Sequence, residues 1–372
     1  MRRFIASGLI VCAMVAATAY GQNNSDAKPA SKGLKDAFAG KFLIGCAGDL
    51  GGRYSEAELA NIKANYNIVT PENCMKPQPI HPSEDRYNWS APDAMVKWCQ
   101  DNNIKIWGHT LVWHAQTGNW FFQGADGQPA TREVALSRLK NHITTVVGHY
   151  KGRVVGWDVV NEAIDDRGAG QGENLRKFSW YRTVGPDVLT LAFKWAHEAD
   201  PDAQLYYNDY NIEQGAVRGT GKHASSMLLL KRLIKEGAPI NGVGIQGHWH
   251  LNTNIADVEK AITDYESLGL KVSISELDVT ATGTNSGAFG NRGGGTVSPE
   301  ALQKQAEVYA KLFDVFNRHS KTISRVTFWG ISDRRSWRAG QRPLLFDAQL
   351  QPKPAYQAIL DVAAGKGATP QP

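Results

Sequence analysis

The segment WDVVNEA, residues 157–163, ends an apolar, strand-like run on a single glutamate, Glu162. The segment SISELDV, residues 273–279, ends in the same way on Glu276. Alternation along the second run places Glu276 and Asp278 on one face. In the first run it places Asp158 and Glu162 on one face. A carboxylate facing an apolar strand environment is costly unless it is paired or functional. Each glutamate alone could simply form a salt bridge at the end of a strand. Whether it has a functional role therefore depends on which residues lie at the other strand ends.

Short β-branched or aromatic runs alternate with segments of helical period from about residue 42 onward, which predicts β/α units around a parallel sheet. An open doubly wound sheet would give similar local patterns. Because no glycine-rich dinucleotide fingerprint follows the first run, we favour a single (β/α)8 TIM barrel with its active site at the C-terminal ends of the strands. The eight runs are residues 42–45, 66–70, 104–107, 154–160, 204–207, 242–245, 271–274 and 325–329.

Several helix boundaries can also be read from the sequence. Residues 55–58, SEAE, fit a capping box, and Ser298 followed by Pro299 fits an N-cap with proline at the first helical position. Between residues 258 and 268 the apolar positions keep one face until Gly269.

The N-terminus has the pattern of a secretory signal peptide. Arg2 and Arg3 precede an apolar stretch at residues 4–17, and small residues follow around Gly21. We therefore expect residues 1–21 to be removed, residues 22–372 to form one catalytic barrel, and the mature protein to be secreted or periplasmic. No later apolar stretch is long enough to cross a bilayer, so we expect no membrane contact after removal of the leader.

The composition fits an ordinary soluble globular chain, with 42% hydrophobic and 21% charged residues among 372. Without the leader arginines, 39 basic residues stand against 36 acidic ones, a net charge of +3 instead of the formal +5. This balance gives no reason to expect nucleic acid as a partner. We expect the mature protein to be a monomer.

Cysteines and histidines give no metal pattern. Three cysteines would remain after export, which allows at most one disulfide, and we expect mostly buried thiols at Cys46, Cys74 and Cys99. Neither HExxH nor a zinc-ligand spacing occurs, so we expect no metal and no organic cofactor.

Aromatic, amide and imidazole side chains recur at other strand ends. Flat aromatic faces suit the C–H faces of pyranose rings, while amides and imidazoles can hydrogen-bond sugar hydroxyls. Each residue alone could be structural, but together with two carboxylates they suggest a glycosidase, in which one carboxyl group protonates the leaving oxygen and another attacks the anomeric carbon. The segments are GHTLVWH with His109, Leu111 and Trp113 on one face, GIQGHWH with Gln246 and His248, and TFWGISDRRSW with Trp329 and Trp337.

From about residue 35 to 364 the chain resembles glycoside hydrolase family 10, the endo-β-1,4-xylanases, with motifs in at least seven of the eight repeats. The resemblance implies a retaining barrel in which WDVVNEA supplies Glu162 as general acid/base and ISELDV supplies Glu276 as nucleophile. Ser275 departs from the threonine that is common before the nucleophile. Strict alternation would point Asn161 and Glu162 to opposite faces, so the strand should become irregular there.

The resemblance also implies a set of sugar-binding residues. Asn161 would bond the sugar 2-hydroxyl, and His248 with Asp278 would hold the nucleophile, with Gln246 beside them. Tyr210 would face the leaving-group side. The remaining residues implied to bind substrate are Glu72, Asn73 and Lys76 of PENCMK, His109 and Trp113, Asn208 of NDYN, and Trp329 and Trp337.

The expected activity is therefore internal hydrolysis of β-1,4-xylan by double displacement, with the polysaccharide as partner and no cofactor. A cellulase or another β-glycanase on the same barrel is the alternative, since stacking tryptophans alone do not reject glucose. A catalytically silent barrel that binds polysaccharide or inhibits other enzymes is a lesser alternative. The presence of both Glu162 and Glu276 argues against it.

Overall fold

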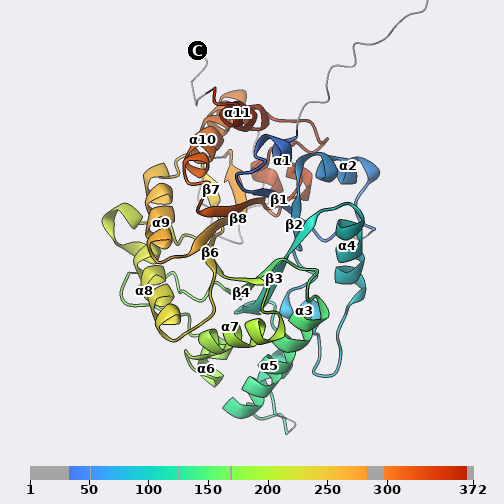
Figure 1. Ribbon diagram of the computed structural model, residues 1–372, viewed down its shortest axis with the longest axis vertical. Helices are drawn as coiled ribbons and strands as arrows, with labels where there is room; N and C mark the ends of the chain where they lie inside the picture. Colours follow the sequence, from blue (N-terminus) through green and yellow to red (C-terminus); the bar gives the residue numbers. More distant parts are fainter. Residues whose placement is uncertain (1–32, 51, 125, 168–169, 283–296, 367–372) are drawn as a thin grey trace, which may run out of the picture. The chain divides into compact units, whose positions relative to one another are not determined.

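The computed structural model describes residues 33–50, 52–124, 126–167, 170–282 and 297–366. The predicted leader, residues 1–21, lies outside these residues. Residues from Gly33 onward form one compact unit, in which parallel strands are surrounded by helices (Figure 1). The barrel strands are β1 (Leu43–Ala47), β2 (Ile68–Thr70), β3 (Lys105–Trp113), β4 (Gly156–Asn161), β5 (Gln204–Asp209), β6 (Gly242–Ile245), β8 (Lys271–Thr280) and β9 (Ile323–Phe328).

Strand pairing closes the sheet into a barrel. Neighbouring strands pair in parallel in the order β6, β5, β4, β3, β2, β1, β9 and β8, and β6 pairs with β8, so that neither remains an edge. Each of the eight predicted runs overlaps one of these strands, and the predicted (β/α)8 barrel is confirmed. β3 and β8 extend well beyond their predicted runs because polar residues continue them toward the barrel mouth.

One additional short strand interrupts the simple pattern. After β6 the chain turns at Gly247, which has φ of 79°, and resumes as β7 (His248–His250). The left-handed backbone conformation at Gly247 is one that glycine adopts without the steric cost of a Cβ atom. β7 pairs only with the far end of β8 and sets His248 directly opposite Asp278.

Helices cover the outside of the barrel (Figure 1). The predicted capping box is present at Ser55 and Glu58, and the predicted N-cap is present at Ser298. The helices are α1 (Leu34–Ala37), α2 (Glu56–Asn65), α3 (Pro77–Ile80), α4 (Ser90–Asp101), α5 (Arg132–His149), α6 (Ser179–Thr183), α7 (Val188–Ala199), α8 (Gly221–Lys235), α9 (Ile255–Ser267), α10 (Pro299–Arg318) and α11 (Pro354–Ala363).

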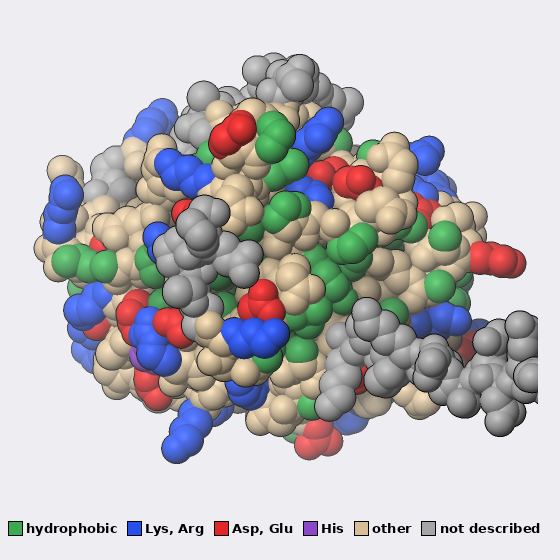
Figure 2. Space-filling view, turned by 90° about the horizontal axis from the view of Figure 1, so that it is seen from above, with side chains coloured by type: hydrophobic (Ala, Val, Ile, Leu, Met, Phe, Trp, Pro, Cys, Tyr) green, Lys and Arg blue, Asp and Glu red, His purple; other side chains and the backbone are tan. Residues whose placement is uncertain are grey.

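The main apolar core lies between the barrel and these helices. Ile68, Trp107 and Tyr206 form a separate small cluster near the N-terminal ends of their strands. The three described cysteines are unpaired, with Cys46 and Cys99 buried. Acidic and basic side chains are interspersed on the face shown in Figure 2, in keeping with the nearly balanced charge. Within the described residues, no helix is both long and apolar enough to cross a membrane.

Candidate active site

Glu162 lies just after β4, where the backbone departs from strand geometry. Its φ is 56°, and the pairing registers shift between His109 and Val112 of β3 and between Asp158 and Val160 of β4. The predicted irregularity is therefore present. A positive φ is uncommon for a residue with a side chain and is found where surrounding contacts hold it.

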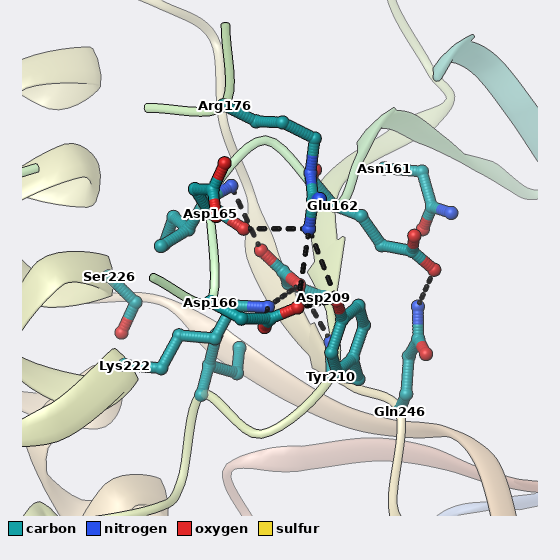
Figure 3. Close-up of polar contacts among 12 residues, drawn as sticks. Asn161, Glu162, Asp165, Asp166, Arg176, Asp209, Tyr210, Lys222, Ser226 and Gln246 are labelled. Carbon is teal, nitrogen blue, oxygen red and sulfur yellow. Dashed lines mark hydrogen bonds and ion pairs between the residues drawn. The ribbon is translucent and has the colours of Figure 1, made fainter. Parts of the chain in front are cut away.

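The carboxyl group of Glu162 is fixed by two donors from other strands. Trp113 Nε1 donates to Oε2 at 2.9 Å. Gln246 Nε2 donates to Oε1 at 2.9 Å (Figure 3). The resemblance implies that Gln246 lies beside His248 and Asp278, and its backbone carbonyl does accept the N–H of Glu276 at 2.8 Å. Just before the turn at Gly247, the side chain of Gln246 also reaches Glu162, a contact that the resemblance does not imply.

The backbone of Glu162 is held by a cluster beyond β4 (Figure 3). Its N–H donates to Asn208 O at 2.8 Å, and Arg176 Nε donates to Glu162 O at 3.2 Å. Arg176 Nη2 also donates to Ile164 O and to the Tyr210 hydroxyl, both at 3.1 Å. Arg176 thus binds two backbone carbonyls on either side of Ala163.

Tyr210 belongs to the same cluster. Its hydroxyl donates to Asp166 Oδ2 at 2.5 Å, and Lys222 Nζ lies 3.5 Å from the centre of its ring. Lys222 is 4% exposed and bridges Asp166 at 3.2 Å and the buried Asp209 at 2.8 Å. The tyrosine therefore flanks the segment that follows Glu162, and charged groups fix its position (Figure 3).

Glu276 is buried on β8, with 5% of its surface exposed. Asn208 Nδ2 donates to Oε1 at 2.8 Å, and His248 Nε2 lies 3.2 Å from Oε2. Burial opposes ionisation of Glu276, but His248, His109 and Asn208 outweigh it, so the pKa lies below the ordinary value for a glutamate. Glu276 is thus ionised at neutral pH.

His248 joins Glu276 to a second buried carboxylate, Asp278. His248 Nδ1 lies 3.0 Å from Asp278 Oδ2, and Trp337 Nε1 donates to the same oxygen at 2.9 Å. Arg338 Nη1 donates to Oδ1 at 3.1 Å. Burial lowers the pKa of His248, but the two carboxylates outweigh burial and raise it to about 9. At neutral pH His248 is therefore a cation between two anions.

Asn208 connects the two halves of the site. The same amide nitrogen that contacts Glu276 also donates to Asn161 Oδ1 at 2.8 Å. Gly244 on the next strand leaves room for this side chain, since a Cβ there would lie 2.2 Å from Asn208 Oδ1. Residues of β4, β5 and β8 therefore meet at this one asparagine side chain.

The PENCMK segment reaches the same cleft. Asp49 Oδ1 accepts the backbone N–H groups of Asn73 and Cys74, each at 2.9 Å, which fixes this turn. Lys76 Nζ donates to Asn73 Oδ1 at 3.2 Å and lies 4.9 Å from the ring centre of Trp113. Burial lowers the pKa of Lys76, and Glu276 is the carboxylate that most opposes this effect.

Burial has the opposite effect on the carboxyl group of Glu72 in this segment. It raises the pKa of Glu72, and the nearby charge of Asp49 raises it further. By its contacts the structure places Lys76 between Asn73 and Trp113, the residue that bonds Glu162.

His109 and Trp329 line the interior rather than an open surface. His109 is 1% exposed and places Nδ1 2.9 Å from Asp158 Oδ2, while its ring meets Trp329 edge-on at 5.4 Å. The expected common face of His109, Leu111 and Trp113 is wrong, because the register shift before Val112 turns Leu111 into the apolar core.

Two residues of the site, Arg176 and Arg338, are not among those that the sequence predicts. Both arginines come from loops, and neither has a spacing that predicts its partner. Alternation in WDVVNEA does place Asp158 on the same face as Glu162, but it does not predict the contacts of Asp158 with His109 and Arg325. In the described part of the chain, no group of three or more His, Cys, Asp or Glu side chains could hold a metal ion.

Two glutamates at the C-terminal mouth of a barrel, surrounded by indole, amide and imidazole groups, define the class of barrel glycoside hydrolases. The sequence pattern of Glycosyl hydrolase family 10 matches residues 33–362. The chain belongs to this family.

Similar proteins include an endo-1,4-beta-xylanase A of Thermoanaerobacterium saccharolyticum, 40% identical over 88% of this chain and 27% of the relative. An Exoglucanase XynX of Acetivibrio thermocellus is also 40% identical, over 88% of this chain and 29% of the relative. The chain thus spans less than a third of these two proteins. It matches 97% of an endo-1,4-beta-xylanase B of Paenibacillus barcinonensis at 39% identity, again over 88% of this chain.

Solved structures show the same fold. A mutant of the xylanase TsXylA of T. saccharolyticum in complex with xylotriose is 39% identical, with a TM-score of 0.80 over 89% of this chain and 99% of that one. XynB of P. barcinonensis in complex with a conduramine derivative has the same TM-score and coverage at 37% identity.

The ion pair between His248 and Glu276 predicts a pH effect. Glu276 has a depressed pKa, so kcat/KM should fall only as pH drops through that low value. His248→Asn removes the cation while burial remains, so the acid limb should move to higher pH by about one unit or more. The profile should be measured on an activated aryl glycoside.

His250→Asn is the matched control, because His250 contacts neither carboxylate in the described structure. The acid limb of the kcat/KM profile of His250→Asn should lie at the same pH as in the unaltered protein. An unmoved limb in His248→Asn would show that this histidine does not set the ionisation of Glu276.

Proposed function

We propose that this chain is an endo-β-1,4-xylanase that hydrolyses internal bonds of xylan with retention of configuration. Its membership of glycosyl hydrolase family 10 and the names of several relatives support this activity. In the proposed reaction, Glu276 attacks the anomeric carbon while Glu162 protonates the departing oxygen. Glu162 then activates a water that hydrolyses the glycosyl enzyme.

The observation that carries the proposal is the contact of Asn208 with both halves of the site. A nucleophile and an acid must reach the same glycosidic bond, and one amide nitrogen bonds Glu276 and the neighbour of Glu162. The two glutamates also have different surroundings. Glu276 faces a protonated imidazole, whereas Glu162 is oriented by the neutral N–H groups of Trp113 and Gln246.

A cellulase-type activity is the second candidate, because one relative of 40% identity is named an exoglucanase. Xylose lacks the C6 hydroxymethyl group of glucose, so an enzyme can favour xylan by crowding the space which that group would fill. Trp337 is 36% exposed and stands 5.0 Å from the ring of His248. We propose that the Trp337 side chain fills part of the space that the C6 hydroxymethyl group of glucose would need.

Glu162→Ala should lose most activity on xylan yet still react with aryl xylobiosides whose leaving group needs no proton. Added azide should restore turnover and give a β-glycosyl azide, because this anion attacks the glycosyl enzyme directly and needs no general base. Initial rates and product NMR test this. Equal losses on activated and unactivated substrates, without azide rescue, would remove Glu162 from the acid/base role.

Arg176→Ala should lower kcat/KM on xylan by roughly tenfold or more, because the carbonyls on both sides of Ala163 lose their donor and Glu162 is no longer held in place. An activated aryl substrate, which needs no acid in the first step, should be affected much less.

Arg176→Lys should restore only part of the activity, since one amino group cannot reproduce the forked contacts of a guanidinium. Lys177→Ala is the control, because among the described residues the Lys177 ammonium group bonds the Tyr181 hydroxyl and no residue of the site. An equal loss on both substrates would indicate general damage and not a positioning role.

The preference for xylose over glucose tests the proposed role of Trp337. The unaltered protein should prefer an aryl xylobioside to the matching cellobioside by at least about tenfold in kcat/KM, roughly 1.4 kcal/mol of discrimination. Trp337→Ala should bring the kcat/KM values for the xylobioside and the cellobioside closer together, because it removes the bulky ring. Trp337→Phe, which loses the bond to Asp278 but keeps a bulky ring, should largely preserve the preference for the xylobioside. A cellobioside preference in the unaltered protein would favour the cellulase.

We also propose that the protein is exported as a monomer after removal of residues 1–21. The twin arginines and apolar stretch of the N-terminus support export. Amino-terminal sequencing of the mature protein should begin at Gln22, and light scattering should give the mass of one chain. Retention of Met1 in the active protein would contradict the export proposal.

A further inference from the structure

A hollow of about 420 Å³ opens at the end of the barrel where the strands begin. Its lining includes Leu43, Lys105, Gln204 and Lys271, each the first residue of its strand. Glu162 lies just beyond the opposite end of β4, and Glu276 lies five residues after the start of β8. The hollow is therefore a second concave site, separate from the candidate active site.

Positive charge is concentrated around this hollow. Among the described residues, five cationic side chains line it and no acidic one does. The lysines form no ion pair with a carboxylate in the described structure, and the two with side-chain contacts bond neutral oxygens. A concave surface lined by one sign of charge raises the local concentration of the opposite ion. The cations are Arg325 and the exposed lysines Lys41, Lys105, Lys271 and Lys321.

Arg325 differs from the four lysines because it is buried, with 1% of its surface exposed. Its Nη1 donates to Thr327 Oγ1 at 3.0 Å, and Nη2 lies 3.4 Å from Asp158 Oδ1. Its Nε is buried and has no hydrogen-bond partner. A buried donor without an acceptor costs free energy, which an incoming anionic oxygen would recover.

The hollow also has apolar walls. The guanidinium of Arg325 lies 4.0 Å from the ring centre of Trp107, and Tyr206 packs edge-on against the same ring at 4.8 Å. Ile68 completes this cluster. Small-molecule pockets typically have volumes of roughly 300–1,000 Å³, apolar walls and a few convergent polar groups. The volume of this hollow falls within that range.

We propose that this hollow binds a small anion, of the size of one carboxylated sugar ring, through Arg325 and the lysines around the opening. A carboxylate or phosphate oxygen would accept the free Nε–H, and the lysine ammonium groups would neutralise the remaining charge. The anion could be an acidic sugar or inorganic phosphate, which share this oxygen chemistry. The site needs no covalent step and does not depend on the activity proposed for the glutamates.

Isothermal titration of the full chain tests the proposal with sodium glucuronate, glucose and inorganic phosphate as probes. Glucuronate should bind saturably at one site, whereas glucose should not. The double variant Lys105→Gln and Lys271→Gln should weaken anion binding by at least about tenfold. Arg325 is not used, because its partner Asp158 contacts His109, which helps to keep Glu276 ionised.

Lys194→Gln and Lys231→Gln together form the matched control, with the same charge change on exposed residues that do not line the hollow. The control should bind as the unaltered chain does, and both double variants should hydrolyse substrate normally. Phosphate binding without glucuronate binding would identify an inorganic anion as the ligand. No saturable binding of either anion, or equal weakening in the control, would overturn the proposal.

Discussion

A glutamate that is 5% exposed can remain ionised only if the protein replaces the water it has lost. In this barrel the replacement is the protonated His248, together with the amide of Asn208. His248 in turn depends on Asp278, which is held by Trp337 and Arg338. Removing one member would leave the next as an uncompensated buried charge. The chain of contacts explains why residues from β5, β7, β8 and the segment after β9 converge at one point.

The other glutamate is controlled through its backbone. A β-strand in regular geometry would direct Asn161 and Glu162 to opposite faces, yet both reach the same cleft. Register shifts in β3 and β4 and the positive φ of Glu162 make this possible. Such a conformation costs about 1 kcal/mol or more, and surrounding contacts must stabilise it. Arg176 and the carbonyl of Asn208 are those contacts.

Sequence patterns predict the parts of this molecule in which apolar residues recur with the period of a strand or a helix. The eight strands, the capping box at Ser55 and the N-cap at Ser298 follow local rules, and WDVVNEA and ISELDV located both glutamates. Alternation failed where β3 becomes irregular, so it gave Leu111 the wrong face. Arg176 and Arg338 could not be predicted, because a loop residue finds its partner only through the path of the loop in space. The basic hollow likewise unites the beginnings of distant strands, which only barrel closure brings together.

The direct test of this account is to trap the covalent intermediate. A 2-deoxy-2-fluoro xylobioside with a good leaving group should inactivate the protein, and peptide mass mapping should find one glycosyl group on Glu276. His248→Asn should be labelled more slowly at acidic pH, because protonated Glu276 cannot attack. A label on Glu162 or any other residue, or product NMR that shows inversion at the anomeric carbon, would contradict the assignment of Glu276 as the ionised nucleophile.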